Sequence, residues 1–243
     1  MRFYLSILFF VGLFFFIPVL AIQAETFSPD QEQYVSFLLP MIHEANTRIL
    51  LQRKELLAAH QWLLMRQSLT QKQKIWIENL AKEYRVENFN LANAQDWKTL
   101  IKRVDIIPPS LALAQSIIES NWGKSRFAKE GNNLYGMWCY TKGCGLIPAQ
   151  RLSGLTFEVK TYETPLDSVC HYVYNLDTGG AYKTFRQLRY QERCKQQILS
   201  GIELTKGMNL YAQNREAYVK SLESVIRNYD LVKYDHERKK MKR

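Results

Sequence analysis

The sequence predicts a mainly helical protein with a small β lobe, and three observations support this prediction. Apolar residues recur three or four positions apart between residues 31 and 67, as an amphipathic helix requires. Helical spacing returns from residue 110 to 121 and, with breaks, from residue 165 to 231. Between residues 134 and 161 the helical period is lost, and glycines and a proline separate short apolar pieces.

Composition favours a globular chain with one domain, or one domain with a helical extension. The chain has 243 residues, of which 47% are hydrophobic and 23% charged. Its formal net charge is +10, which suggests an anionic partner such as a wall polymer or a membrane surface, or serves only solubility. Nucleic acid is a weaker prospect, because no nucleic-acid-binding motif is recognised and the chain has the start of an exported protein.

The N-terminus reads as a targeting segment. Arg2 is the only charge before Glu25, and an apolar run lies between them. The small residues before Glu25 suit a signal peptidase that cuts after Ala24, so residues 1–24 are predicted to be a signal peptide. The run is also long enough for an uncleaved membrane anchor. In either case we expect an exported chain, in the periplasm or cell envelope.

The region 25–105 is predicted to be a helical N-terminal extension. Helices are expected at residues 31–67, 71–84 and 94–103, and Pro40 should kink or restart the first of them.

A second region, 106–232, is predicted to be the catalytic domain. Ser110 is the expected N-cap of a helix that stops near residues 121–123, where glycine closes it. Residues 157–162 alternate like a strand, and a helical pattern returns at Pro165. The remainder, 233–243, is a basic, solvated tail.

Four cysteines in an exported chain permit disulfides. Cys139 and Cys144 flank a turn-like stretch and are predicted to pair. Cys170 lies in an apolar pattern and reads as a buried thiol, although a bridge to Cys194 is possible. The histidines form no ligand spacing, so neither a metal nor another cofactor is expected.

Glu119 is the candidate catalytic residue. It falls roughly 110° from the centre of the apolar stripe of its helix, at the boundary between core and solvent. It also lies in the last turn, where the helix carries partial negative charge. Both partial burial and this field raise a carboxyl pKa, as a glycosidase acid needs, whereas most glutamates are simply solvated.

The stretch ALAQSIIESNWGKS (112–125), followed by NNLYG (132–136), resembles the catalytic segment of the peptidoglycan N-acetylglucosaminidases of glycoside hydrolase family 73. The resemblance covers roughly residues 108–230. It implies a lysozyme-like fold, with a helical domain and a small β lobe across a cleft. It also implies that Glu119 is the general acid.

The resemblance further implies a second carboxylate on the β lobe and a tyrosine in the cleft. Glu158 is the expected second acid, because Glu163 stands where a helix begins. It would act on water, or leave that work to the acetamido group of the substrate. Tyr182 matches the tyrosine, with a half-buried core role as the alternative.

Substrate-binding roles are expected in and just after the NNLYG turn at residues 132–136. Tyr135, Trp138 and Tyr140 could stack on sugar faces, with a core role as the alternative for the first two. Asn133 could contact an acetamido group or hold the turn.

The predicted function is an exported hydrolase that cuts the β-1,4 bond after N-acetylglucosamine in peptidoglycan glycan strands. The rivals are a lytic transglycosylase, which needs no second carboxylate, and a non-catalytic wall-binding or scaffold protein of the same fold. The long helical extension would suit contact with a partner protein, which nothing in the sequence names.

Overall fold

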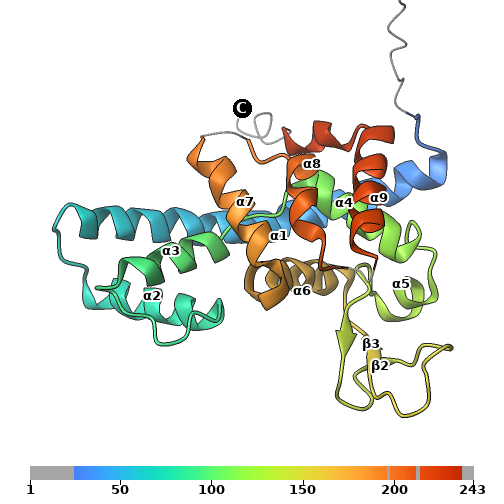
Figure 1. Cartoon of the computed structure of the whole chain (residues 1–243), viewed down its shortest axis with the longest axis horizontal. Coiled ribbons are helices and arrows are strands. Elements are labelled where there is room, and N and C mark those ends of the chain that lie inside the picture. The colour runs from blue at the N-terminus through green and yellow to red at the C-terminus, as the bar shows by residue number, and fades with distance from the viewer. Residues whose placement is uncertain (1–24, 196–197, 212–213, 237–243) are drawn as a thin grey trace, which may run out of the picture.

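The computed structural model describes residues 25–195, 198–211 and 214–236. It is mainly helical with one small sheet, as the sequence predicts (Figure 1). The predicted signal peptide or anchor, 1–24, and most of the basic tail lie outside the described residues. Within the described residues, no helix is long and apolar enough to cross a membrane.

Three helices form the N-terminal region: α1 (Pro29–Leu64), α2 (Gln71–Glu83) and α3 (Ala94–Arg103). The first two begin with capping boxes, in which Ser28 and Thr70 each exchange hydrogen bonds with a glutamine three residues on. The predicted bounds of α2 and α3 are confirmed to within one residue.

The restart expected at Pro40 does not occur, because α1 continues through it. Leu38, Ile42 and Ala45 on either side of the proline are buried, and α1 packs against α4 (Pro109–Ser120) and α6 (Pro165–Thr178). Burial of this face offsets the lost backbone hydrogen bond of the proline.

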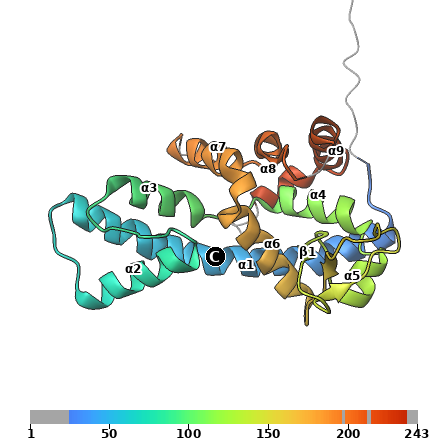
Figure 2. The same ribbon diagram turned by 60° about the horizontal axis from the view of Figure 1, so that its bottom comes forward.

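Helix α4 lies at the centre of the fold, and most of its residues are buried. It is surrounded by α1, by α8 (Gly201–Leu204), by α9 (Arg215–Asn228) and by the 3₁₀ turn η3 (Leu231–Asp235). Figure 2 shows α1 and α4 running side by side along the long axis of the molecule.

Ser110 is not the N-cap of α4, so that prediction was wrong. The helix begins at Pro109, and Ser110 is already its second residue. The carboxylate of Asp235 takes the capping role, accepting hydrogen bonds from the Ser110 backbone N–H (2.9 Å) and hydroxyl (2.7 Å). A cap supplied from 125 residues away leaves no local sequence signal.

The β lobe comprises β1 (Trp138–Cys139), β2 (Gly145–Leu146) and β3 (Glu158–Lys160), and the helix α5 (Arg126–Gly131) precedes it. Both outer strands pair antiparallel with β3, giving the order β1-β3-β2. The Cys139–Cys144 disulfide closes the connection between β1 and β2, as predicted. The possible Cys170–Cys194 bridge is absent, since both residues are free thiols.

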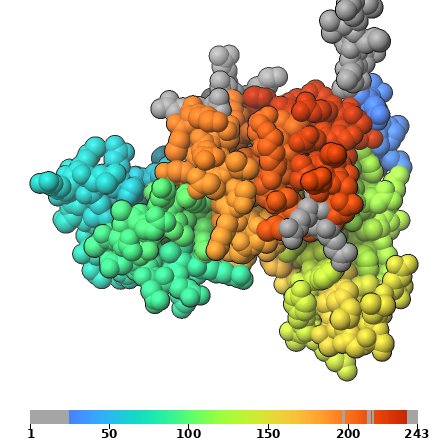
Figure 3. Space-filling view, viewed as in Figure 1, coloured from blue at the N-terminus to red at the C-terminus, as the bar shows by residue number. Residues whose placement is uncertain are grey.

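The remaining helices are η1 (Gly180–Tyr182), α7 (Lys183–Cys194) and η2 (Thr205–Met208). The N-terminal helices α2 and α3 project at one end of the helical body, and the β lobe projects at the other (Figures 1 and 3). The boundaries predicted at residues 105 and 232 stay predictions.

Buried charges connect the N-terminal helices to the rest. Arg189 on α7 donates hydrogen bonds to the carbonyls of Lys102 and Asp105, at the end of α3, and pairs with buried Asp177 at 2.7 Å. Arg193 holds the Asp105 carboxylate through two nitrogens. Although burial acts to raise the pKa of Asp105, the hydrogen bond from Arg193 and the surrounding guanidinium charges hold it below its ordinary value.

Candidate active site

Glu119 lies in the last turn of α4, with its side chain partly buried. Its carboxylate faces the turn at Gly136. A Cβ added to that glycine would stand 3.1 Å from Glu119 Oε2, and the φ of Gly136 is +65°. The fold therefore brings together the two parts of the sequence motif, the end of the helix and the NNLYG turn.

The chain reverses sharply after Glu119. Asn121, Trp122 and Gly123 all adopt left-handed φ values of 49°, 57° and 71°, which ends α4. The Ser120 hydroxyl accepts a hydrogen bond from the Gly123 N–H at 2.8 Å. Gly123 is required here for a second reason, because an added Cβ would approach the ring of Tyr34 to 2.6 Å.

Burial raises the pKa of the Glu119 carboxyl, and a hydrogen bond from Tyr218 on α9 opposes this rise without cancelling it. The predicted direction of the shift therefore agrees with the structure, and burial is its main cause. A carboxyl with a raised pKa keeps its proton at higher pH than an ordinary glutamic acid, as proton donation requires.

Tyr218 belongs to a chain of hydrogen bonds that ends on Glu119. The Tyr172 hydroxyl donates to Gln115 Oε1 at 2.6 Å, and Gln115 Nε2 donates to the Tyr218 hydroxyl at 3.1 Å. Because Tyr218 oxygen already accepts from Gln115, its own proton is free to be donated to Glu119. Sequence reasoning missed Tyr218, which lies 99 positions beyond Glu119 on another helix.

Two further tyrosines, Tyr182 and Tyr211, lie close enough to Glu119 for its charge to affect their pKa. Burial raises the pKa of Tyr182, and the nearby charge of Glu119 adds to the effect. Burial and the charge of Glu119 also raise the pKa of Tyr211. The Tyr211 ring stacks on Tyr218, with ring centroids 5.5 Å apart, and its hydroxyl donates a hydrogen bond to the Tyr135 carbonyl at 2.8 Å. Tyr182, the tyrosine predicted from the sequence, is thus near Glu119, but its hydroxyl hydrogen-bonds Asn175.

Glu158, the predicted second acid, is engaged within the β lobe. Its two oxygens accept hydrogen bonds from the backbone N–H groups of Gly143 (3.0 Å) and Gly145 (2.8 Å). These two bonds hold the pKa of Glu158 below its ordinary value. The carboxylate therefore fastens the disulfide-closed loop, and its catalytic role stays a prediction.

Asn133 and Tyr135 take the structural roles that the sequence offered as alternatives. The Asn133 amide donates to the carbonyls of Met137 and Lys160, and its oxygen accepts from the N–H groups of Tyr135 and Met137. Tyr135 is fully buried and stacks on Tyr172 at 3.9 Å. Both side chains are thus engaged within the protein, and their sugar-binding roles stay predictions.

Trp138 and Tyr140 are exposed on the β lobe, by 50% and 71%. The Trp138 ring stacks on Phe157, with centroids 4.3 Å apart. Their sugar-stacking roles stay predictions, and both rings are accessible for such contact.

The β lobe also gathers potential metal ligands. Single ligand atoms of Cys139, Cys144 and Glu158 lie within 4.8 Å of one another. The two sulfurs are joined as a disulfide, and both carboxylate oxygens accept backbone hydrogen bonds. These donor atoms are therefore already engaged in the disulfide and in hydrogen bonds.

Comparison with known families decides the classification. The glucosaminidase family, described as mannosyl-glycoprotein endo-beta-N-acetylglucosaminidase, matches residues 94–231, more than half of the chain. The chain belongs to the glucosaminidase family.

The chain is also similar to one individual protein in sequence and to one solved structure. Protein bax of Escherichia coli is 29% identical over 194 residues, which cover 79% of this chain and 66% of the relative. The chain thus spans slightly less than two thirds of that protein's length. Among solved structures, the catalytic domain of the autolysin Auto from Listeria monocytogenes aligns with 86% of this chain and 90% of its own, at 16% identity and a TM-score of 0.47.

The range matched to the family includes Glu119 and Tyr218 but not α1. Nevertheless α1 contacts the helix that carries Glu119. The Tyr34 hydroxyl lies 2.6 Å from Ser116 Oγ and 2.9 Å from Ser120 Oγ. The first helix therefore buttresses the candidate site from outside the matched range.

Proposed function

We propose that this glucosaminidase is an endo-β-N-acetylglucosaminidase that cuts the β-1,4 bond after N-acetylglucosamine in peptidoglycan. Family membership supports glycoside hydrolysis. The observation that carries the proposal is Glu119, a carboxyl whose pKa is raised by burial and whose ionised form Tyr218 stabilises. A glycosidase requires such a carboxyl to protonate the leaving oxygen.

The acid step follows from these two residues. Glu119, in its protonated form, donates its proton to the glycosidic oxygen as the bond to the sugar breaks. The carboxylate that results carries a charge in a partly buried position. The Tyr218 hydroxyl, already hydrogen-bonded there, stabilises that charge without further rearrangement.

The substrate itself is the better candidate for the second catalytic group. Both Glu158 oxygens accept hydrogen bonds from Gly143 and Gly145. Among the described residues, burial and Tyr218 are the influences on the Glu119 pKa, and no second carboxylate contributes. A retaining pair would stand only about 5 Å apart and would perturb each other strongly. We therefore assign the attack on the sugar to its own acetamido oxygen rather than to a carboxylate nucleophile.

The lack of a second carboxylate among the influences that the described residues exert on the Glu119 pKa also favours one alternative reaction. A lytic transglycosylase uses a lone glutamate and a hydroxyl of the substrate as the attacking group. It also needs no second carboxylate, and it leaves anhydro-muramic ends.

The products of digestion test the proposal. Purified peptidoglycan is incubated with the full-length chain, and the fragments are reduced with borohydride and weighed by mass spectrometry. Reduced N-acetylglucosamine ends support the proposal, and anhydro-muramic ends support the transglycosylase. Intact glycan after incubation with correctly folded protein would contradict both.

We also propose that the protein is exported to the cell envelope, where peptidoglycan lies. The apolar run before residue 25 and the net charge of +10 support export and retention on an anionic surface. N-terminal sequencing of the protein recovered from cells tests this: a start at Glu25 means cleavage after Ala24. An intact N-terminus in the membrane fraction means an anchor, and recovery from the cytosol contradicts export.

A further inference from the structure

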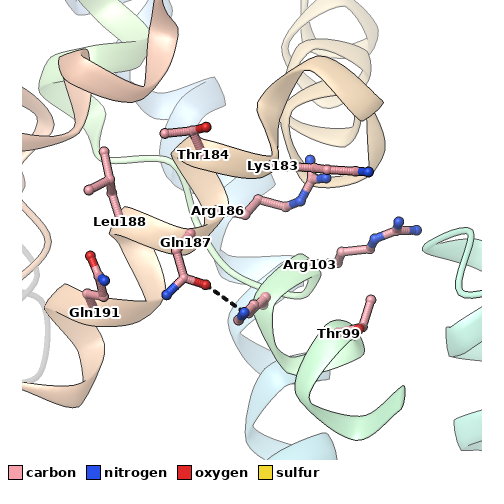
Figure 4. A pocket seen from close by; sticks show the side chains of 9 residues that line it. Thr99, Arg103, Lys183, Thr184, Arg186, Gln187, Leu188 and Gln191 are labelled. Atoms are coloured by element: carbon pink, nitrogen blue, oxygen red, sulfur yellow. Dashed lines mark hydrogen bonds between the residues drawn. The ribbon is translucent and has the colours of Figure 1, made fainter. Parts of the chain in front are cut away.

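A cavity lies between α3 and α7, and Glu119 is not among the residues that line it (Figure 4). Its volume is about 560 Å³, within the range of small-molecule sites. Of the nine described side chains that line it, none is acidic and four are cationic. These four are Lys102, Arg103, Lys183 and Arg186.

Among the residues that the structure describes, none of these four cations forms an ion pair with an acid. The Lys102 ammonium donates to an uncharged amide, Gln187 Oε1, at 2.6 Å. Lys183 is exposed and makes no hydrogen bond or ion pair with any residue that the structure describes. The closest buried acid, Asp177, is already paired with Arg189 at 2.7 Å.

Burial and neighbouring cations lower the pKa of both arginines of the pocket. Burial, followed by repulsion from Arg103 and Arg189, lowers the pKa of Arg186 to about 10. Burial and the charge of Arg85 lower the pKa of Arg103. An anion in the pocket would oppose both effects.

The two guanidinium groups are held in place while part of each stays available. Arg186 Nη1 donates to the carbonyls of Leu176 and Gly179, both at 2.8 Å. Arg103 Nη1 donates to the Tyr84 carbonyl at 2.7 Å. All their hydrogen bonds within the described residues leave from Nη1, so Nε and Nη2 stay free for the paired contact that arginine makes with an oxyanion.

Figure 4 shows the ends of Arg103, Lys183 and Arg186 on the same side of the pocket, although they come from two helices. We propose that this pocket is a binding site for an oxyanion with more than one negative charge, of the carboxylate or phosphate class. Its size accommodates a group larger than a single inorganic ion.

Two sources could supply such an anion. Lys183 directly follows Tyr182, whose pKa responds to the charge of Glu119, so the pocket adjoins the candidate active site along the chain. The acidic peptide stems of the proposed substrate are therefore one source. A soluble phosphate compound is the other.

Calorimetric titration of the full-length chain with citrate and with inorganic phosphate tests the site. We expect saturable binding with a Kd of about 1 mM or tighter for at least one of them. Lys183→Gln should weaken it about tenfold, because one charge-assisted hydrogen bond is lost. The matched control is Lys54→Gln, which removes the same charge from an exposed position on α1 and should bind like the wild type.

A peptidoglycan disaccharide–peptide with free carboxylates then distinguishes the sources. Competition with citrate, absent when those carboxylates are amidated, assigns the pocket to the substrate's stems, and failure to compete assigns it to a soluble anion. The site is overturned by an absence of saturable binding, or by equal weakening in Lys183→Gln and Lys54→Gln, which would indicate only diffuse charge. Because the readout is binding, its failure is separate from any failure of hydrolysis.

Discussion

The hydroxyl of Tyr218, on α9, donates a hydrogen bond to the carboxylate of Glu119, on α4. This bond favours the ionised form of Glu119, whereas burial favours the protonated form. The balance between them sets the pH at which the carboxyl can act as an acid. Activity should be present below the raised pKa of Glu119 and fall as the pH rises through it.

Removing the Tyr218 hydroxyl should move that balance. Tyr218→Phe leaves burial unopposed, so the Glu119 pKa rises further and the alkaline limb of kcat/KM shifts upward by roughly one pH unit. The maximal rate should fall by about 10- to 100-fold, since the carboxylate formed in the acid step loses its donor. The pH–rate profile measures both. Tyr182→Phe is the control and should leave the limb in place, because its hydroxyl bonds Asn175.

Replacing Glu158 separates a catalytic role from a structural one. In Glu158→Gln a single oxygen remains for the two backbone N–H groups of Gly143 and Gly145. We expect faster amide hydrogen exchange at these glycines and hydrolysis within about tenfold of the wild type. A loss of about 1,000-fold with unchanged exchange would instead make Glu158 the second catalytic acid.

The turn after Glu119 should be sensitive to a single methyl group. Gly123→Ala meets the Tyr34 ring at 2.6 Å and keeps a φ of +71°, so the free energy of unfolding should fall by about 3 kcal/mol. Gly143→Ala is matched in φ, at +81°, but has nothing within 4 Å, and should cost about 1 kcal/mol. Urea unfolding of both variants measures the difference. Equal losses would mean that the Tyr34 contact does not constrain the turn.

The buried pair of Arg189 and Asp177 predicts a pH-dependent stability. Burial raises the pKa of Asp177 to about 7, and Arg189 opposes the rise. In Arg189→Met the carboxylate loses its partner and the free energy of unfolding should fall by about 3–5 kcal/mol. Loss of Arg189 raises this pKa further, so the folded variant keeps the carboxyl protonated at pH values where the wild type ionises. The deficit should therefore grow as the pH rises above about 7.

Unfolding of the double variant Arg189→Met/Asp177→Asn provides the control. The double variant has no charge to bury at this site. Its loss of unfolding free energy relative to the wild type should therefore not vary over this pH range. A deficit in Arg189→Met that is independent of pH would show that only the hydrogen bonds of Arg189 to the carbonyls of Lys102 and Asp105 matter.

The sequence predicted features that depend on neighbouring residues. The end of α4 follows from Gly123, and the disulfide follows from the turn between Cys139 and Cys144. Glu119 could be predicted as the candidate acid because its position at the edge of the apolar stripe and its motif are both local.

Features that depend on distant residues could not be predicted. The Asp235 cap and the Tyr218 hydrogen bond come from elements more than 90 residues away in the chain. The continuity of α1 through Pro40 depends on what covers its buried face. The alternation of residues along β3 predicted a strand. It could not reveal that the Glu158 carboxylate accepts hydrogen bonds from Gly143 and Gly145 in the neighbouring loop.

The most direct test compares digestion of purified peptidoglycan by the full-length wild type, Glu119→Gln and Glu130→Gln. Glu130 is an exposed acid on α5 and serves as the matched control. With circular dichroism and unfolding midpoints equal, we predict that Glu119→Gln loses about 1,000-fold or more in the rate at which reducing ends appear, while Glu130→Gln keeps the wild-type rate. A Glu119→Gln variant that digests peptidoglycan as fast as the wild type would contradict the assignment of Glu119 as the general acid.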